Sequence, residues 1–237
     1  MAVKDRLESR TTHVTVGSTY DNVANLADAF IEKIIAKYEG TRLGRQELYA
    51  EILTEVPGAL WKREVIEQYR VRRMPALARV VVAVDPAASD SEGSAETGII
   101  VAGVGEDRNA YVFDDVSLHA SPDGWAKQAV AAYYRHNADR IVAEVNNGGD
   151  MVGYTVRTVD QGVAYKDVRA SRGKQIRAEP VAALYEQGKV HHVGYFGELE
   201  DQLCTWVPGE KSPDRLDALV WALTELMLDG HEAADIF

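Results

Sequence analysis

Residues 80–90 have the sequence VVVAVDPAASD, a run of five apolar residues that ends on Asp85 and breaks at Pro86. An unbroken apolar run of this kind is typical of a strand that is buried on both faces. A carboxylate at the end of such a strand costs free energy unless a partner or a cation compensates its charge. An aspartate before a proline is also common where a strand runs into a turn, so the role of Asp85 depends on what lies beside it.

The composition is that of a globular protein with an excess of acidic residues. The 237 residues are 46% hydrophobic, and 37 acidic against 26 basic residues leave a formal charge of −11. We expect a sizeable core, and any nucleic-acid contact must be local, because the overall charge has the wrong sign for coating nucleic acid. Cys204 is the single cysteine, which excludes an intrachain disulfide and a cysteine-rich zinc site. No stretch approaches the roughly 18 apolar residues of a membrane span, and we expect a soluble, intracellular protein.

The chain divides into a helical beginning and a strand-rich remainder. Apolar residues recur at helical spacing within residues 18–73, and an arginine-rich stretch followed by Pro75 then separates this part from the first strand. We therefore expect residues 1–75 to form a helical linker segment and residues 76–237 to form the main domain.

The main domain is predicted to be an α/β fold with a mixed sheet. Three β-rich runs come first, at 79–85, 97–105 and 110–118, and an antiparallel meander is their simplest arrangement. Helices and strands then alternate, with helices at 121–137, 149–160, 174–187 and 213–228, and strands at 140–145, 163–168 and 190–193. The alternating half needs crossover helices to keep its strands parallel, so we expect helices on both faces of the sheet.

A second carboxylate, Glu144, lies in the predicted strand RIVAEV at 140–145. If that strand is buried, the charge must be paired or must coordinate a metal. The alternative is an exposed strand end, or a salt bridge to a base such as Arg140. The residues that follow, NNGG at 146–149, allow the backbone to turn sharply beside this carboxylate.

Two more carboxylates, Asp214 and Asp217, open the predicted helix SPDRLDALVWALTEL at 212–226. Ser212 and Pro213 are typical of an N-cap and a first helical residue. Asp214 then lies in the first turn, where the helix dipole favours a negative charge by roughly 0.3–1 kcal/mol. Asp217 lies three residues on, on the same side of the helix. The pair is either the edge of an amphipathic helix or a pair of ligands for one cation.

The four carboxylates can converge at one edge of the sheet. This requires the strands that carry Asp85 and Glu144 to be neighbours, with the start of the last helix beside them. Oxygen ligands of this kind suit Mg²⁺ or Mn²⁺. Two such ions about 3.5–4 Å apart are the usual device for hydrolysing a phosphodiester, so the carboxylates indicate phosphodiester hydrolysis.

Four ordered motifs resemble a known nuclease family. The segments VVVAVDPAAS at 80–89, IVAEVNNGGDMV at 141–152, residues 168–194 and SPDRLDALVWAL at 212–223 are similar to the C-terminal nuclease domain of the large terminase subunit of tailed bacteriophages. That domain has a ribonuclease-H-like fold. The segments THVTVGSTYDNVANLADAFIEKI and YEGTRLGRQELYAEIL, within residues 12–53, are similar to the connection between the packaging ATPase and the nuclease, so the resemblance covers nearly the whole chain.

The resemblance implies an endonuclease that uses Mg²⁺ or Mn²⁺ to cut concatemeric viral DNA at the start and end of each packaging cycle. Matched motif by motif, Asp85, Glu144 and Asp214 are the catalytic, metal-holding acids, and Asp217 is a fourth ligand or an orienting group. The implied partners are double-stranded DNA, the terminase ATPase domain, the small terminase subunit and the portal, in the host cytoplasm and away from membranes.

A basic stretch is the candidate DNA-facing edge. Arg169, Arg172, Lys174 and Arg177 lie within nine residues after the fifth predicted strand. Clusters of this kind bind backbone phosphates, and the alternative is a solvated helix start. We expect Trp221 to serve packing.

Two other functions share most of these features. One is a different ribonuclease-H-like nuclease, such as a junction resolvase. The other is a docking module of the packaging motor with little nuclease activity in isolation. The chain contains no GxxxxGK[ST] loop for binding nucleotide phosphates, so we expect no ATP hydrolysis.

Overall fold

The structure is a computed structural model that describes residues 56–86, 96–145, 150–169 and 174–229. The elements in chain order are α4 (Arg63–Gln68), β1 (Leu77–Asp85), β2 (Glu96–Gly105), β3 (Ala110–Asp115), β4 (Leu118–His119), α5 (Pro122–Arg135), β5 (Arg140–Glu144), α6 (Asp150–Val159), β6 (Tyr165–Val168), α7 (Lys174–Glu186), β7 (Val190–His192), α8 (Gly197–Thr205), α9 (Asp214–Leu223) and the π-helix η2 (Thr224–Leu228).

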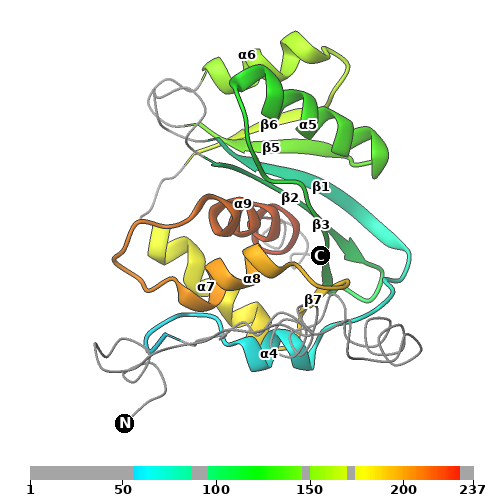
Figure 1. The fold of residues 1–237 in the computed structure, drawn as a ribbon. Helices are drawn as coiled ribbons and strands as arrows, with labels where there is room; N and C mark the ends of the chain where they lie inside the picture. The colour runs from blue at the N-terminus through cyan, green and yellow to red at the C-terminus, as the bar shows by residue number, and fades with distance from the viewer. Residues whose placement is uncertain (1–55, 87–95, 146–149, 170–173, 230–237) are drawn as a thin grey trace, which may run out of the picture. The chain divides into compact units, whose positions relative to one another are not determined.

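The described strands form one mixed sheet in the order β6-β5-β1-β2-β3-β7, with β4 paired to β2 (Figure 1). The strands β1, β2 and β3 form the expected antiparallel meander. On the other side of β1, the strands β5 and β6 run parallel to it, as the alternation of helices and strands predicted. The mixed α/β sheet expected from the sequence is therefore confirmed, and the strands that end on Asp85 and Glu144 are neighbours.

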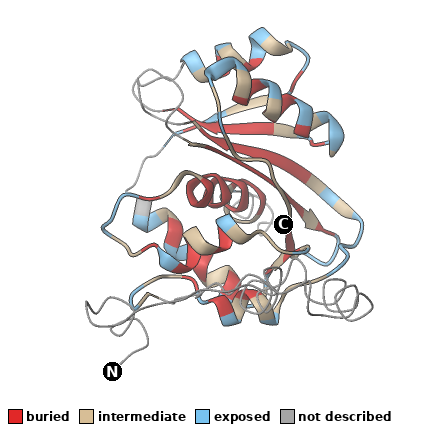
Figure 2. Ribbon diagram, in the orientation of Figure 1, coloured by how far each residue is buried: buried red, intermediate tan, exposed pale blue. Residues whose placement is uncertain are grey.

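Helices cover both faces of this sheet: α5 and α6 lie on one side, and α4, α7, α8 and α9 lie on the other (Figure 1). Each face of the sheet has its own hydrophobic core. The apolar run of β1 contributes side chains to both, because successive side chains of a strand point to opposite faces. Val80, Val82 and Val84 pack in the core under α5, whereas Val81 and Ala83 pack in the core around α9. Figure 2 shows the resulting band of buried residues along the middle strands.

The helix α9 is buried along its length, since every residue from Arg215 to Leu223 is buried. It continues into η2, where the buried Glu225 is held by cations from three neighbouring strands. Arg79 of β1 pairs with it, Arg140 of β5 lies 3.3 Å away, and Lys166 of β6 lies 2.6 Å away. Arg140, which the sequence offered as a partner for Glu144, thus pairs with Glu225.

Some boundaries follow the sequence and others do not. Ser121 caps α5 as predicted, and Gly188, at a φ of 68°, follows α7. The helix α8 was not predicted, although Leu199 and Leu203 at helical spacing are both buried in the core. Its nine residues begin at Gly197 without a side-chain cap, so it lacks the usual signals of a helix start. The predicted last helix is also shorter, because η2 replaces its final turn.

Residues just before the sheet belong to the same compact unit, which spans Glu55–Phe237. Trp61 and the α4 residue Ile66 are buried in the core around α9. The helices predicted upstream lie outside the described residues, so the division into 1–75 and 76–237 stays a prediction. No helix in the described ranges is long and apolar enough to cross a membrane.

A buried network of charges ties the segment around α4 to α8 and β7. The carboxylate of Glu200 is 0% exposed and accepts hydrogen bonds from Arg70 at 2.7 and 2.9 Å and from His192 at 3.0 Å. The other nitrogen of His192 accepts a hydrogen bond from the Tyr185 hydroxyl at 2.8 Å. Burial alone would raise the pKa of the Glu200 carboxyl, but the bonds from His192 and Arg70 outweigh it and lower this pKa to about 2.

We predict that Glu200→Gln destabilises the protein at pH 7 by about 1.5–3 kcal/mol, because Arg70 and His192 lose a charged hydrogen-bond acceptor and Arg70 keeps only the partly exposed Glu67 as counter-charge. In the wild type, the folded-state pKa of Glu200 lies below its ordinary value of 4.5. Its contribution is therefore complete above pH 4.5 and is lost as the pH falls toward 2. Urea denaturation at a series of pH values should show a smaller acid-induced loss in the variant.

The matched control is Asp123→Asn, which removes a carboxylate from an exposed ion pair on α5. This variant should lose no more than about 1 kcal/mol, because exposed surface pairs and a first-turn carboxylate each contribute little. An equal response of the two variants would contradict the role given to Glu200.

Candidate active site

Asp85 and Glu144 close two neighbouring parallel strands. Val84 of β1 pairs with Ala143 of β5, so Asp85 and Glu144 are the next residues at the same edge of the sheet. Each lies two positions beyond a side chain of the core around α9, so alternation along the strands directs both carboxylates to the α9 face. Asp85 is only 5% exposed and Glu144 only 4%.

The first turn of α9 lies directly against this edge. Gly98 of β2 pairs with Asp85, and a Cβ atom on Gly98 would lie 2.0 Å from the carbonyl oxygen of Asp214. No side chain fits between these backbones, so glycine is required at this position. The close approach brings the backbone of Asp214 next to the strand pair that carries Asp85.

Arg215 anchors the same turn to the sheet. Its guanidinium lies 2.6 Å from a carboxylate oxygen of Glu96 in β2 and 2.7 Å from one of Asp115 in β3. Burial alone would lower the pKa of Arg215, but the interactions with Glu96 and Asp115 outweigh it and raise this pKa. The start of α9 is thereby fixed by ion pairs as well as by backbone contact.

Ser212 acts on Asp217 and not as the predicted N-cap. The helix begins at Asp214 with Pro213 in the capping position, one residue later than expected. The hydroxyl of Ser212 instead donates a hydrogen bond to Oδ2 of Asp217, and both side chains are buried. This bond orients the carboxylate of Asp217 in the first turn of the helix.

Glu144 is held from the side of α7 and α9. Trp221 donates a hydrogen bond from Nε1 to Oε2 of Glu144 at 2.8 Å. Nη1 of Arg177 lies 3.7 Å from the same oxygen, and its guanidinium carbon lies 4.2 Å from the centre of the Trp221 ring. Arg177, expected on the DNA-facing surface, therefore lies beside a carboxylate of the site. Trp221 packs as predicted, but its hydrogen bond was not foreseen.

The structure describes only two of the three other residues of the predicted basic stretch. Arg169 is exposed directly after β6, Lys174 is the first residue of α7, and Arg172 lies outside the described residues. A groove of about 380 Å³ is lined by residues of β6, α7, α9 and η2, among them Arg169, Arg177 and Trp221. Because Arg177 and Trp221 also contact Glu144, this groove adjoins that carboxylate.

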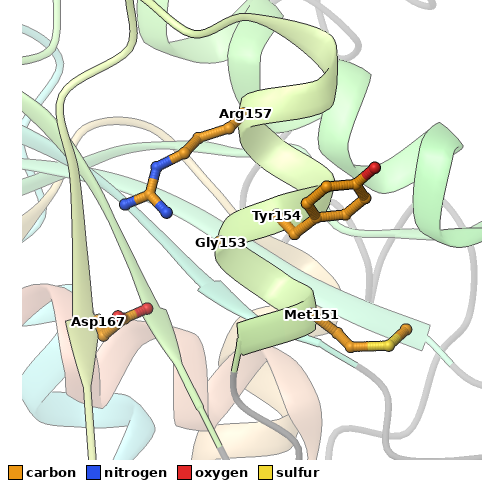
Figure 3. A pocket seen from close by; sticks show the side chains of 5 residues that line it. All are labelled: Met151, Gly153, Tyr154, Arg157 and Asp167. Carbon is orange, nitrogen blue, oxygen red and sulfur yellow. The ribbon is translucent and has the colours of Figure 1, made fainter.

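A second groove, of about 450 Å³, lies between α6 and β6 (Figure 3). Its β6 member, Asp167, pairs with Ala143, whose side chain packs in the core under α5. This groove therefore opens on the opposite face of the sheet from Glu144. Its lining residues are Met151, Gly153, Tyr154, Arg157 and Asp167.

The donor set determines which ion the site could hold. Within the described ranges, no three His, Cys, Asp or Glu side chains are gathered closely enough to enclose a metal. Two buried carboxylates at adjacent strand ends, with Asp214 and Asp217 on the helix beside them, nevertheless offer only oxygen ligands. Such ligands fit a hard divalent cation such as Mg²⁺ or Mn²⁺ and not a soft one.

Comparisons with known proteins identify relatives of this fold. The family model of the terminase RNaseH-like domain matches residues 82–226, a range that includes all four carboxylates. The nuclease domain of the large terminase subunit gp2 of bacterial virus Sf6 superposes with a TM-score of 0.54 at 13% identity, over 70% of this chain and 98% of that one. The large terminase nuclease of thermophilic phage G20c with bound cobalt gives a TM-score of 0.51 at 13% identity, over 72% and 99%.

The G20c nuclease with bound magnesium gives a TM-score of 0.50 at 12% identity, over 72% of this chain and 99% of that one. No curated protein matches the chain. The expected ribonuclease-H-like fold and the resemblance to terminase nuclease domains are both confirmed.

We predict that Gly98→Ala forces the start of α9 away from β2 and lowers the free energy of unfolding by about 1–3 kcal/mol or more. The added methyl group would meet backbone atoms, which cannot turn aside as a flexible side chain can. Gly162→Ala is the control, because its Cβ would meet only side-chain atoms, Oδ1 of Asp160 at 3.2 Å and the hydroxyl of Tyr134 at 3.9 Å. Urea denaturation of both variants measures the difference, and equal stability would contradict the close approach.

Proposed function

Because the chain belongs to the family of terminase RNase H-like domains, we propose that it is a metal-dependent endonuclease that cuts concatemeric phage DNA during genome packaging. The observation that carries the proposal is the pair of buried carboxylates, Asp85 and Glu144, at the ends of neighbouring parallel strands beside the start of α9. The similar G20c nuclease binds cobalt and magnesium, which supports metal dependence in this chain.

We assign Asp85, Glu144 and Asp214 as the acids that hold Mg²⁺ or Mn²⁺, with Asp217 as a fourth ligand or an orienting group. When bound, a pair of such ions supplies a nucleophile at neutral pH and stabilises the leaving oxygen of the phosphodiester. Asp85 and Glu144 are buried at adjacent strand ends, and their carboxylate oxygens are the kind of ligand that a hard divalent cation prefers. Ser212 limits the motion of Asp217 through its hydrogen bond.

The proposed substrate is double-stranded DNA, approaching along the groove that adjoins Glu144. Arg169 lines this groove, and we propose that it contacts backbone phosphates together with Arg172 and Lys174, which are close to it in the sequence. The attraction is then local in a chain of charge −11. The proposed partners in packaging are the terminase ATPase domain, the small terminase subunit and the portal, and the proposed location is the host cytoplasm.

We predict that Asp85→Asn and Glu144→Gln each reduce cleavage of plasmid DNA, in Mg²⁺ or Mn²⁺, by at least about 100-fold. Even groups that only orient a metal ligand affect activity or affinity by about 10–100-fold, so the loss of a ligand should reach or exceed that range. Gel electrophoresis of nicked and linear plasmid measures the rate, and circular dichroism checks that the variants are folded.

The matched control is Asp123→Asn, an exposed carboxylate on α5, the helix that covers the opposite face of the sheet from α9 (Figure 1). It should cut at the wild-type rate. Unchanged cleavage by both site variants, with contaminating nucleases excluded, would overturn the assignment. A wild-type chain that binds DNA but cuts none would favour a docking module.

We further predict that Arg169→Ala combined with Lys174→Ala weakens DNA binding and flattens its salt dependence. Each lost phosphate contact should reduce the slope of log affinity against log salt by about 0.9. Fluorescence anisotropy with a short duplex measures this, in an Asp85→Asn background that prevents cleavage. Lys127→Ala, on the exposed side of α5, is the control. If the double variant and this control have the same salt slope, the basic stretch is not part of the DNA interface.

A further inference from the structure

Arg177 is an unusual residue for its nearly buried position between the core around α9 and the groove. Its side chain is only 11% exposed, and within the described part of the chain its Nε and Nη1 atoms are buried and make no hydrogen bond. Buried guanidinium donors without acceptors are unfavourable, and an apolar side chain of similar length would pack there without that cost. Packing alone therefore does not explain an arginine at this position.

Two interactions offset the cost. The guanidinium stacks on the indole ring of Trp221, at 4.2 Å, and its Nη1 lies 3.7 Å from Oε2 of Glu144. Stacking on tryptophan is the strongest form of cation–π contact and is strengthened by burial. The 3.7 Å separation is too long for a hydrogen bond, so the guanidinium attracts Oε2 without taking up one of its lone pairs.

Trp221 makes the direct contact with the carboxylate. Its Nε1 donates a hydrogen bond to Oε2 at 2.8 Å, and the ring that carries this donor is covered by Arg177. The indole is therefore held between the arginine of α7 and the carboxylate of β5. Both interactions converge on one oxygen of Glu144.

We propose that Arg177 and Trp221 are positioning residues that fix Glu144 by Oε2 and leave Oε1 to bind the catalytic cation. This inference rests on the proposed function, because it concerns the same carboxylate. A glutamate side chain has three rotatable bonds, and holding them before the ion arrives removes that entropy cost from binding. The positive charge beside Oε2 also disfavours a cation on that side and directs it to Oε1.

The test measures binding of Mn²⁺ to the full chain without DNA, by isothermal titration calorimetry. Trp221→Phe keeps the aromatic ring but removes the N–H donor, and Arg177→Lys keeps the charge but loses the planar stack. We expect Trp221→Phe to weaken Mn²⁺ binding by about 10-fold or more, as the loss of a ligand's orienting partner typically does. Arg177→Lys, which acts through the indole, should weaken it by a smaller factor.

The matched control is Trp206→Phe, which removes another buried indole donor, one that bonds to the backbone of Glu210 at 3.3 Å. It should bind Mn²⁺ as the wild type does. Thermal unfolding of each variant checks the fold. If Trp221→Phe does not fold, the Mn²⁺ affinity of Arg177→Lys tests the proposal instead.

A spectroscopic measurement adds independent information. Paramagnetic Mn²⁺ quenches nearby tryptophans, so an ion on Glu144 should quench Trp221, and both the wild type and Trp206→Phe should lose fluorescence on titration. In Arg177→Lys the quenching should remain but require more Mn²⁺. A general loss of structure would not produce this pattern.

The variant Glu144→Gln separates a failure of the proposed metal site from a failure of the positioning role. If Glu144→Gln binds Mn²⁺ like the wild type, the proposed metal site is wrong. If Glu144→Gln loses binding while Trp221→Phe and Arg177→Lys bind like the wild type, the metal site stands and the positioning role of Arg177 and Trp221 is overturned.

Discussion

The contact between Gly98 and the first turn of α9 is the constraint on which the candidate site depends. It sets the depth at which the helix lies against the sheet, because there is no side chain to hold the two backbones apart. Ion pairs then fix the helix at both ends, through Arg215 at its start and through Glu225 just after its end. The strands that end on Asp85 and Glu144 are thereby held in a defined relation to the helix.

The sequence was informative where burial and chemistry act locally. The apolar run before Asp85 and the alternation of helices and strands after residue 121 led to the antiparallel meander and the mixed sheet. That the strands of Asp85 and Glu144 are neighbours was only a condition for the carboxylates to converge, and the parallel pairing of β1 and β5 meets it. The helix start was misjudged by one residue, since Pro213 takes the capping position and Ser212 turns to Asp217.

The sequence was misleading where a local pattern competed with a distant contact. Arg177 follows Arg169 and Lys174 closely, so a basic surface was the natural interpretation. Yet it lies one helical turn before Val181, on the side of α7 that faces the core, and that spacing was a signal that could have been used. The partner of Trp221 could not be inferred, because nothing near it in the chain points to Glu144.

The late position of α9 among the elements has a consequence for how the site forms. All the described strands precede this helix in the chain, so the sheet can assemble before the helix docks on it. The candidate site is complete only after that last step, because its carboxylates are divided between the sheet and the helix. A folding intermediate with its sheet in place but α9 still undocked would expose an apolar face and would lack the part of the candidate site that α9 carries.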